Sequence, residues 1–282
     1  MLGQAALSLG IPIRLLAEEP HGSAAQAVAQ TTVGDYHDLQ TLRQLTDGCD
    51  VLTFDHEHVP ISHLAALADD GVACRPGPHA LVHAQDKGVM RSRMDELDVP
   101  SPRHALVHDA AAVTSFADTV GGFPVVLKTT RGGYDGKGVW FVGTENECAA
   151  AFETAARSGV HILAEEKVDF RRELAALVAR SPSGQAAAYP VAESVQKGGV
   201  CHEVVVPAPG LPERLALEAQ QIALRVAGAL DVTGILAVEL FETRDPSTLR
   251  RAQESASSGE PGRILVNELA RIRPVSPELA LS

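Results

Sequence analysis

Residues 124–142 read PVVLKTTRGGYDGKGVWFV, and this stretch decides how the middle of the chain folds. Two apolar runs, PVVLK and VWFV, flank a segment in which four of seven residues are glycine, from Gly132 to Gly138. Backbone N–H groups of such a loop can point at phosphate oxygens, and Lys128 at the end of the first run adds a positive charge. Because Gly138 follows Lys137, the GxxxxGK[ST] pattern of a P-loop fails. The stretch predicts a strand, a flexible glycine-rich loop and a second strand, and an ordinary structural turn is the alternative.

The residues ahead of this stretch alternate between helix-like and strand-like patterns. Helices are expected at residues 2–9, 38–48 and 60–68, and strands at residues 11–17 and in the run VLTF at 51–54. Short apolar runs separated by helices are typical of parallel strands with crossover helices, which predicts a doubly wound α/β layer. Such a layer usually begins with a strand and a glycine-rich turn, whereas this chain opens inside a helix. We therefore expect the first strand to be missing.

The pattern of the chain changes after Val107. Helices are expected at residues 86–97, 110–120 and 211–230, and Thr144 with Glu147 predicts a capping box for a further helix ending near Ser158. Strands are expected at residues 161–166, 171–180, 186–191, 202–207, 234–241 and 263–269. The middle block therefore predicts an α+β unit built on an antiparallel sheet. Residues 244–262 are polar and rich in Ser and Gly, and we expect a mobile insertion there.

Composition excludes several classes of protein. The 282 residues suit two domains, and 24 Lys plus Arg against 36 Asp plus Glu give a net charge of −12, which would repel nucleic acid. No apolar stretch approaches about 18 residues and the start lacks a signal-peptide pattern, so we expect a cytoplasmic protein that does not enter a membrane. The cysteines show no CxxC spacing and are interpreted as buried small hydrophobic residues: Cys49, Cys74, Cys148 and Cys201.

Two apolar strands carry carboxylates that would be costly to bury alone. Glu239 lies in AVELF, and Asn267 with Glu268 lies in LVNEL. A shared cation is the best explanation for two such costs, and carboxylate and amide oxygens suit Mg²⁺. The alternative is that each glutamate points to the solvent face of its strand.

Acidic residues also mark the end of the strand at 161–166. Glu165, Glu166, Lys167 and Val168 end this strand, and Glu173 follows closely. Carboxylates and open backbone groups at a strand end can hydrogen-bond an adenine amino group and ribose hydroxyls. A solvated hairpin fits the same residues.

The segment Asp55-His56-Glu57-His58 alternates acidic residues with histidines. In an extended chain His56 and His58 share one face, which suits a metal, while Asp55 and Glu57 share the other. The alternative is a carboxylate-lined loop at the carboxyl end of a strand, where doubly wound folds bind ligands.

Together these motifs resemble the ATP-grasp carboligases of purine biosynthesis. Lys128, GGYDGKG, AEEKVDFRRE, YPVAESV, GILAVELF and LVNELA occur in the order and spacing of that family, and TFDHEHVP and HAQDK match it upstream. The resemblance implies a preATP-grasp doubly wound domain at residues 1–85 and a two-part ATP-grasp domain at residues 86–282, with a lid at about residues 107–170. It implies ATP-dependent carboxylation of 5-aminoimidazole ribonucleotide by bicarbonate through carboxyphosphate, with Mg²⁺ or Mn²⁺ bound. It also suggests a homodimer.

The resemblance assigns roles to individual residues. Lys128 would be the catalytic cation, Glu239 and Glu268 would hold the metal, and Glu57 would lie on the ribonucleotide side. ATP-binding positions carried over from the family are Lys87, Lys128, Gly133, Tyr134, Asp135, Gly136, Lys137, Gly138, Val139, Glu165, Glu166, Lys167, Val168, Glu173, Gln196, Asn267 and Glu268.

The chain departs from the family pattern at both ends. The family has a strand and a glycine-rich turn ahead of the residue that matches Met1, and it continues past Ala270 with a segment that completes the substrate site. We therefore expect a truncated sequence that turns over poorly. Two alternatives remain: another ATP-grasp ligase, such as formate-dependent glycinamide ribonucleotide transformylase, and a non-catalytic ATP-binding remnant.

Overall fold

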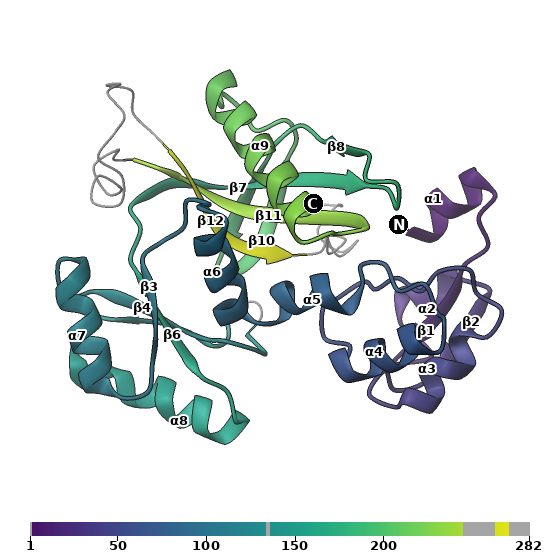
Figure 1. Ribbon diagram of the computed structural model, residues 1–282, viewed down its shortest axis with the longest axis horizontal. Coiled ribbons are helices and arrows are strands. Elements are labelled where there is room, and N and C mark those ends of the chain that lie inside the picture. Colours follow the sequence, from purple (N-terminus) through teal and green to yellow (C-terminus); the bar gives the residue numbers. More distant parts are fainter. Residues whose placement is uncertain (1, 134–135, 245–262, 271–282) are drawn as a thin grey trace. The chain divides into compact units, whose positions relative to one another are not determined.

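The computed structural model describes residues 2–133, 136–244 and 263–270 (Figure 1). The chain forms two compact units, residues 1–81 and 82–282, which are described separately. None of the helices within the described ranges is long and apolar enough to cross a membrane. Residues 245–262 of the predicted insertion lie outside these ranges.

The first unit is a small α/β layer. Its elements are α1 (Leu2–Leu9), β1 (Arg14–Ala17), α2 (Ser23–Ala27), β2 (Gln30–Val33), α3 (Leu39–Thr46) and α4 (Ile61–Asp69). The two strands pair in parallel, from Arg14 opposite Gln30 to Ala17 opposite Val33, which agrees with the predicted parallel layer. The predicted strand at 51–54 is wrong, because Leu52 forms only a single parallel bridge with Cys74.

The boundary between the two units falls within a helix. Helix α5 (Pro78–Gln85) runs across the division, and α6 (Lys87–Glu96) follows it. Asp86 caps α6, since its carboxylate accepts hydrogen bonds from the backbone N–H groups of Gly88 and Val89. The cap fixes where α6 begins and therefore which way Lys87 and the residues one turn later project.

The second unit begins with a four-stranded antiparallel sheet of order β3-β6-β4-β5. Its strands are β3 (His104–Val107), β4 (Val125–Thr129), β5 (Val139–Val142) and β6 (Ile162–Glu166). Helices α7 (Ala110–Val120) and α8 (Ala149–Ser158), with a short 3₁₀ turn at Glu145–Cys148 between β5 and α8, supply the rest of its core. Val125 and Leu127 belong to that core. Because neighbouring residues of a strand face opposite sides, Lys128 lies on the face away from this core.

The remaining strands form a second antiparallel sheet of order β10-β9-β7-β11-β12, with β8 paired to β7. These strands are β7 (Phe170–Arg180), β8 (Ala186–Ala188), β9 (Ala192–Lys197), β10 (Val200–Val205), β11 (Gly234–Thr243) and β12 (Ile264–Ala270). The long helix α9 (Glu213–Ala229) packs against β7, β8 and β11. The single antiparallel block expected for the middle of the chain is thus divided between two sheets, and the division falls between β6 and β7.

Two smaller predictions need correction. The Thr144 hydroxyl contacts the Glu147 carboxylate at 3.1 Å, and that carboxylate accepts the backbone N–H of Gly143 at 2.8 Å, so the predicted capping box does not form. The residues after Thr144 make a 3₁₀ turn before α8 instead of entering an α-helix directly. All four cysteines are free thiols, but only Cys148 is fully buried.

The four-stranded sheet offers a direct test of its core. Leu127 is 0% exposed, whereas Leu106 on β3 is 60% exposed. We expect Leu127→Ala to lower the free energy of unfolding by about 2–5 kcal/mol, because it leaves a cavity, and Leu106→Ala to cost much less. Trp140 is the only tryptophan and lies opposite Leu127 on β5, so its fluorescence during urea unfolding reports on this sheet. Equal losses in the two variants would contradict the assignment of Leu127 to the core.

Candidate functional site

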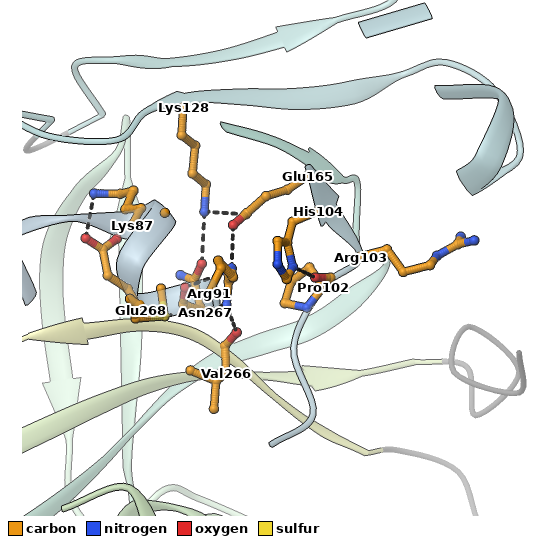
Figure 2. Close-up of polar contacts among 12 residues, drawn as sticks. Lys87, Arg91, Pro102, Arg103, His104, Lys128, Glu165, Val266, Asn267 and Glu268 are labelled. Carbon is orange, nitrogen blue, oxygen red and sulfur yellow. Dashed lines mark hydrogen bonds and ion pairs between the residues drawn. The ribbon is translucent and has the colours of Figure 1, made fainter. Parts of the chain in front are cut away.

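Charged side chains from four elements of the second unit meet on the face of β4 that carries Lys128. Figure 2 shows Lys87 from α6, Lys128 from β4, Glu165 from β6, and Asn267 with Glu268 from β12. These elements include strands of both sheets, so the site joins the two halves of the unit. Five residues selected from the sequence motifs are therefore neighbours in space.

Lys128 is held by two partners. Its ammonium lies 2.7 Å from Glu165 Oε2 and donates to Asn267 Oδ1 at 3.2 Å. The side chain is only 11% exposed, so its position is set by these contacts and not by solvent. A buried ammonium that lies between one carboxylate and one neutral amide keeps capacity to bind a further anion.

Lys87 occupies the first position of α6 and forms a 2.7 Å ion pair with Glu268. Its backbone N–H donates to the carbonyl of Thr130, and Asp86 forms a 2.6 Å ion pair with Arg131 at the start of the glycine-rich segment. The start of α6 is thus tied to the end of β4 at two points, which sets the two lysines near one another.

A β-bulge explains how Asn267 and Glu268 both serve the site. Glu268 lies opposite Glu239, but Leu240 lies opposite Val266, so Asn267 is an extra residue on β12. In a regular strand consecutive side chains point to opposite faces, and a bulge relaxes that alternation. Asn267 therefore reaches Lys128 while its neighbour Glu268 reaches Lys87.

Glu239 lies among other carboxylates. Burial, and then the charges of Glu268 and Glu173, raise the pKa of Glu239 to about 7. Burial also raises the pKa of Glu173. Glu239 is paired with Ala175 on β7 and Phe241 with Glu173, so Glu173 and Glu239 share one face of the sheet. A carboxylate that resists ionisation beside two others is a place where a cation would be favourable.

The two glutamates at the end of β6 are buried and paired. Burial alone would raise the pKa of Glu165, but Arg91 and Lys128 outweigh it and hold that pKa at about 2. Glu166 accepts the backbone N–H of Arg103 at 2.8 Å and its Nε at 2.9 Å. The solvated-hairpin interpretation is therefore wrong for both residues. Because both carboxylates are engaged, a ligand at this strand end would meet backbone groups and the exposed side chain of Lys167.

Arg91 is a member of the site that the motifs did not identify. It is 1% exposed and bonds Glu165 Oε1 at 2.7 Å, the Val266 carbonyl at 2.7 Å and the Asn267 carbonyl at 2.8 Å (Figure 2). One sequence signal was available: Arg91 follows Lys87 by four residues, so the two share one face of α6.

The glycine-rich loop is partly described. Thr129 N–H donates to the Gly138 carbonyl at 2.9 Å, and Gly138 has a φ of +75°. A Cβ at Gly138 would lie 2.5 Å from Thr129 Oγ1, so the turn requires glycine there. Gly133, Gly136, Lys137 and Val139 lie in the described part of the loop, whereas Tyr134 and Asp135 lie outside the described residues.

Three other predicted positions have different surroundings. Lys167 is exposed and Val168 is buried just after β6. Gln196 on β9 is exposed and donates to Ser194 Oγ at 2.8 Å, and among the described contacts it does not join the lysine–carboxylate cluster.

The histidine segment belongs to the first unit. The rings of His56 and His58 lie 5.2 Å apart, and the backbone N–H of His58 donates to His56 Nδ1 at 3.1 Å. Burial, with the charge of His58, lowers the pKa of His56. Glu57 Oε1 lies 3.7 Å from His58 Nε2. Throughout the described ranges, no three His, Cys, Asp or Glu side chains converge on one point, so the metal-binding alternative for His56 and His58 gains no third ligand.

Two protein-family models and several curated proteins match this chain. The ATP-grasp domain family matches residues 92–274, and the ribonucleotide synthetase preATP-grasp domain family matches residues 1–85. N5-carboxyaminoimidazole ribonucleotide synthase of Corynebacterium ammoniagenes is 47% identical over 274 residues, which cover 97% of this chain and 63% of that protein. The chain thus spans about three fifths of the length of the curated relatives it matches.

Two solved structures are similar over nearly all of the chain. The N5-carboxyaminoimidazole ribonucleotide synthetase of Thermus thermophilus superposes with a TM-score of 0.80 at 31% identity, and covers 96% of this chain and 67% of its own. An ADP complex of an N5-carboxyaminoimidazole ribonucleotide synthetase gives a TM-score of 0.82 at 29% identity, with 98% and 67% covered. The chain has a buried lysine–carboxylate cluster between two antiparallel sheets, and a parallel α/β layer comes before these sheets in the sequence. With the matches above, this chain belongs to the ATP-grasp family, alongside the N5-carboxyaminoimidazole ribonucleotide synthases.

Proposed function

We propose that this chain carries the ATP-binding part of a carbon–nitrogen ligase that carboxylates 5-aminoimidazole ribonucleotide with bicarbonate. The observation that carries the proposal is the buried cluster in which Lys87 and Lys128 face Glu268, Glu165 and Asn267. Two fixed ammonium groups beside a carboxylate pair suit a nucleoside triphosphate with its metal ion. The names of the relatives point to 5-aminoimidazole ribonucleotide as the molecule that accepts the carboxyl group.

ATP binding follows from the same residues. Lys87 and Lys128 would contact the phosphates, and residues 133–139 would cover them. Because the carboxylates of Glu165 and Glu166 are held by Arg91, Lys128 and Arg103, the adenine would be recognised by backbone groups of residues 165–168. Glu173 would accept from ribose hydroxyls, with Gln196 on the nucleotide side.

The donor set fits Mg²⁺ or Mn²⁺. Glu239 and Glu268 are directly opposite each other on β11 and β12, and the pKa of Glu239 is raised to about 7. Mg²⁺ commonly takes one or two protein carboxylates and completes its shell with phosphate and water. Glu239 and Glu268, with Asn267 beside them, would hold the ion, which supplies charge neutralisation on the phosphate oxygens.

The reaction proceeds in two steps. A bicarbonate oxygen attacks the γ-phosphorus of ATP, the bond to ADP breaks, and carboxyphosphate forms. The exocyclic amine of the imidazole ribonucleotide then attacks the carboxyl carbon of carboxyphosphate and displaces phosphate, or carboxyphosphate first breaks down to phosphate and CO₂ and the amine attacks that CO₂. In both cases the amine nitrogen loses a proton. Lys128 is the catalytic residue in this scheme, because its ammonium offsets charge that spreads over the transferring oxygens. The glycine-rich loop would keep water from carboxyphosphate.

The remaining assignments rest on the family resemblance. Glu57 would lie on the ribonucleotide side of the first domain, residues 1–85, and residues 86–282 would form the ATP-grasp domain with its lid. We also propose a cytoplasmic homodimer that acts on small-molecule substrates, and the net charge of −12 argues against nucleic acid as a partner.

Substrate-dependent ADP release tests the proposed function. We expect 5-aminoimidazole ribonucleotide with bicarbonate to stimulate ADP release from MgATP, measured with a coupled enzyme assay. Stimulation by glycinamide ribonucleotide with formate would instead indicate the transformylase reaction. ATP binding without stimulation by either pair would indicate a nucleotide-binding protein without this activity.

Lys128 provides a second test. We expect Lys128→Met to lower the rate of stimulated ADP release by about 100-fold or more, because it removes a preorganised charge from the transferring phosphoryl group. Lys197→Met, at an exposed lysine on β9, serves as the control and should retain the wild-type rate. Similar rates for the two variants would rule out the catalytic role of Lys128.

Glu239 provides a pH-dependent test. Because its pKa is raised from 4.5 to about 7, the folded state binds this proton more tightly than the unfolded state, and stability falls as pH rises between those values. We therefore expect Glu239→Gln to raise the melting temperature at pH 8 and to change it little at pH 4.5.

The same variant should lose the stabilisation that MgADP gives the wild type, because one metal-binding carboxylate is gone. Glu203→Gln, at an exposed carboxylate on β10, is the control for both measurements. A melting temperature of Glu239→Gln that matches the wild type at both pH values would support the solvent-facing alternative.

A further inference from the structure

The side chain of Arg91 closes a ring of polar contacts around Lys128. Its Nε donates to Glu165 Oε1, Glu165 Oε2 pairs with Lys128, and Lys128 donates to Asn267 Oδ1. Arg91 Nη2 returns to the carbonyl of that same Asn267. The ring joins α6, β6, β4 and β12 (Figure 2).

The contacts of Arg91 with β12 match the bulge. Val266 directs both of its backbone groups away from β11, since its N–H donates to Pro100 and its carbonyl accepts from Arg91 Nη1. In a regular antiparallel strand the next carbonyl would point back toward the paired strand. Instead the Asn267 carbonyl also accepts from Arg91, at 2.8 Å. One planar guanidinium therefore holds two consecutive carbonyls on the same edge while its Nε bonds Glu165, a set of three partners that suits its rigid fork of donors.

The charges in the ring explain why Lys128 can still bind an anion although it is paired with Glu165. Arg91 and Lys128 share the single carboxylate of Glu165. If Arg91 were absent, Glu165 and Lys128 would neutralise each other as a simple pair. With Arg91 present, the three groups carry a net positive charge, and the ammonium of Lys128 carries part of it toward the site.

We propose that Arg91 is a positioning residue for phosphate binding, which sets Lys128 through Glu165 and sets Asn267 and Glu268 through the carbonyls of the bulge. The inference rests on the ATP binding of the proposed function, and its catalytic readout rests on the proposed carboxylation as well. Arg91 makes no contact with substrate in this role; it acts by fixing residues that do.

The test compares Arg91→Lys with Arg103→Lys in the full chain. Both variants remove a guanidinium from a glutamate at the end of β6, but Arg103 contacts Glu166 and the carbonyls of Thr119 and Val120 instead of the ring. We would measure the Kd of MgATP and of adenosine by calorimetry, because adenosine lacks the phosphates that Lys128 binds. Where turnover is present, kcat and KM for ATP would follow.

We expect Arg91→Lys to weaken MgATP binding by about 10- to 100-fold, the size of a lost charged hydrogen bond, with adenosine affinity within about two-fold. Arg103→Lys should leave the ratio of the two Kd values unchanged. In turnover, kcat of Arg91→Lys should fall as well as KM rise, since Lys128 is misplaced in the transition state too. A ratio in Arg91→Lys equal to that in Arg103→Lys would overturn the inference.

A second variant protects the test against misfolding. Glu165→Asp shortens the carboxylate by one methylene, so it cannot hold Arg91 and Lys128 together, and we expect the same selective loss of MgATP affinity. An unchanged Kd ratio in that variant overturns the inference as well. The ratio of the MgATP and adenosine Kd values is measured without the ribonucleotide. If the wild type showed no ribonucleotide-stimulated ADP release, the proposed carboxylation would be wrong. A shifted Kd ratio in Arg91→Lys would still support the role of Arg91.

Discussion

The sharing of one buried carboxylate by two cations is the interaction on which the rest of the site depends. Glu165 is 3% exposed, and it is stable in that position only because Arg91 and Lys128 both lie 2.7 Å from its oxygens. Removal of either cation would leave a poorly compensated charge in a low-dielectric setting. The same contacts hold β4 and β6 of the four-stranded sheet against α6. Through Asn267 they also hold β12, the edge strand of the larger antiparallel sheet. The contacts that position the binding groups of this unit are therefore also the contacts that hold its elements together.

Local patterns predicted much of the fold, although the apolar run at 51–54 forms no strand and Thr144 forms no capping box. Apolar runs identified β4, β5 and β11, alternation identified β7, and helix-like patterns identified α3, α6, α7 and α9, because each signal lies within one element. The division between the two sheets was not predictable, since β6 and β7 are separated by only three residues and both read as antiparallel strands. Strand partners are chosen by long-range packing, which the local pattern does not record.

Candidate site residues follow the same rule. Lys128, Glu239 and Glu268 were identified because a charged residue within or at the end of an apolar run is a local anomaly, whereas Lys87 was identified only through the family resemblance. Arg91 was missed because its partners lie 74 and 176 positions away along the chain. The fate of Glu166 was missed for the same reason, since its partner Arg103 is 63 positions away. A sequence reports that a charge will be buried, whereas only the folded chain reports what compensates it.

The bulge at Asn267 has a consequence for how this region tolerates change. Two polar side chains that are adjacent in sequence serve one face only because the strand carries one residue more than its partner. Deletion of Asn267, the one residue between Val266 and Glu268, would restore regular pairing and remove the amide that contacts Lys128. A deletion elsewhere in β12 would instead shift the register and turn the side chains on one side of it to the opposite face, whereas a substitution alters one side chain only. Length in this short segment is therefore under tighter physical constraint than the identity of most residues around it.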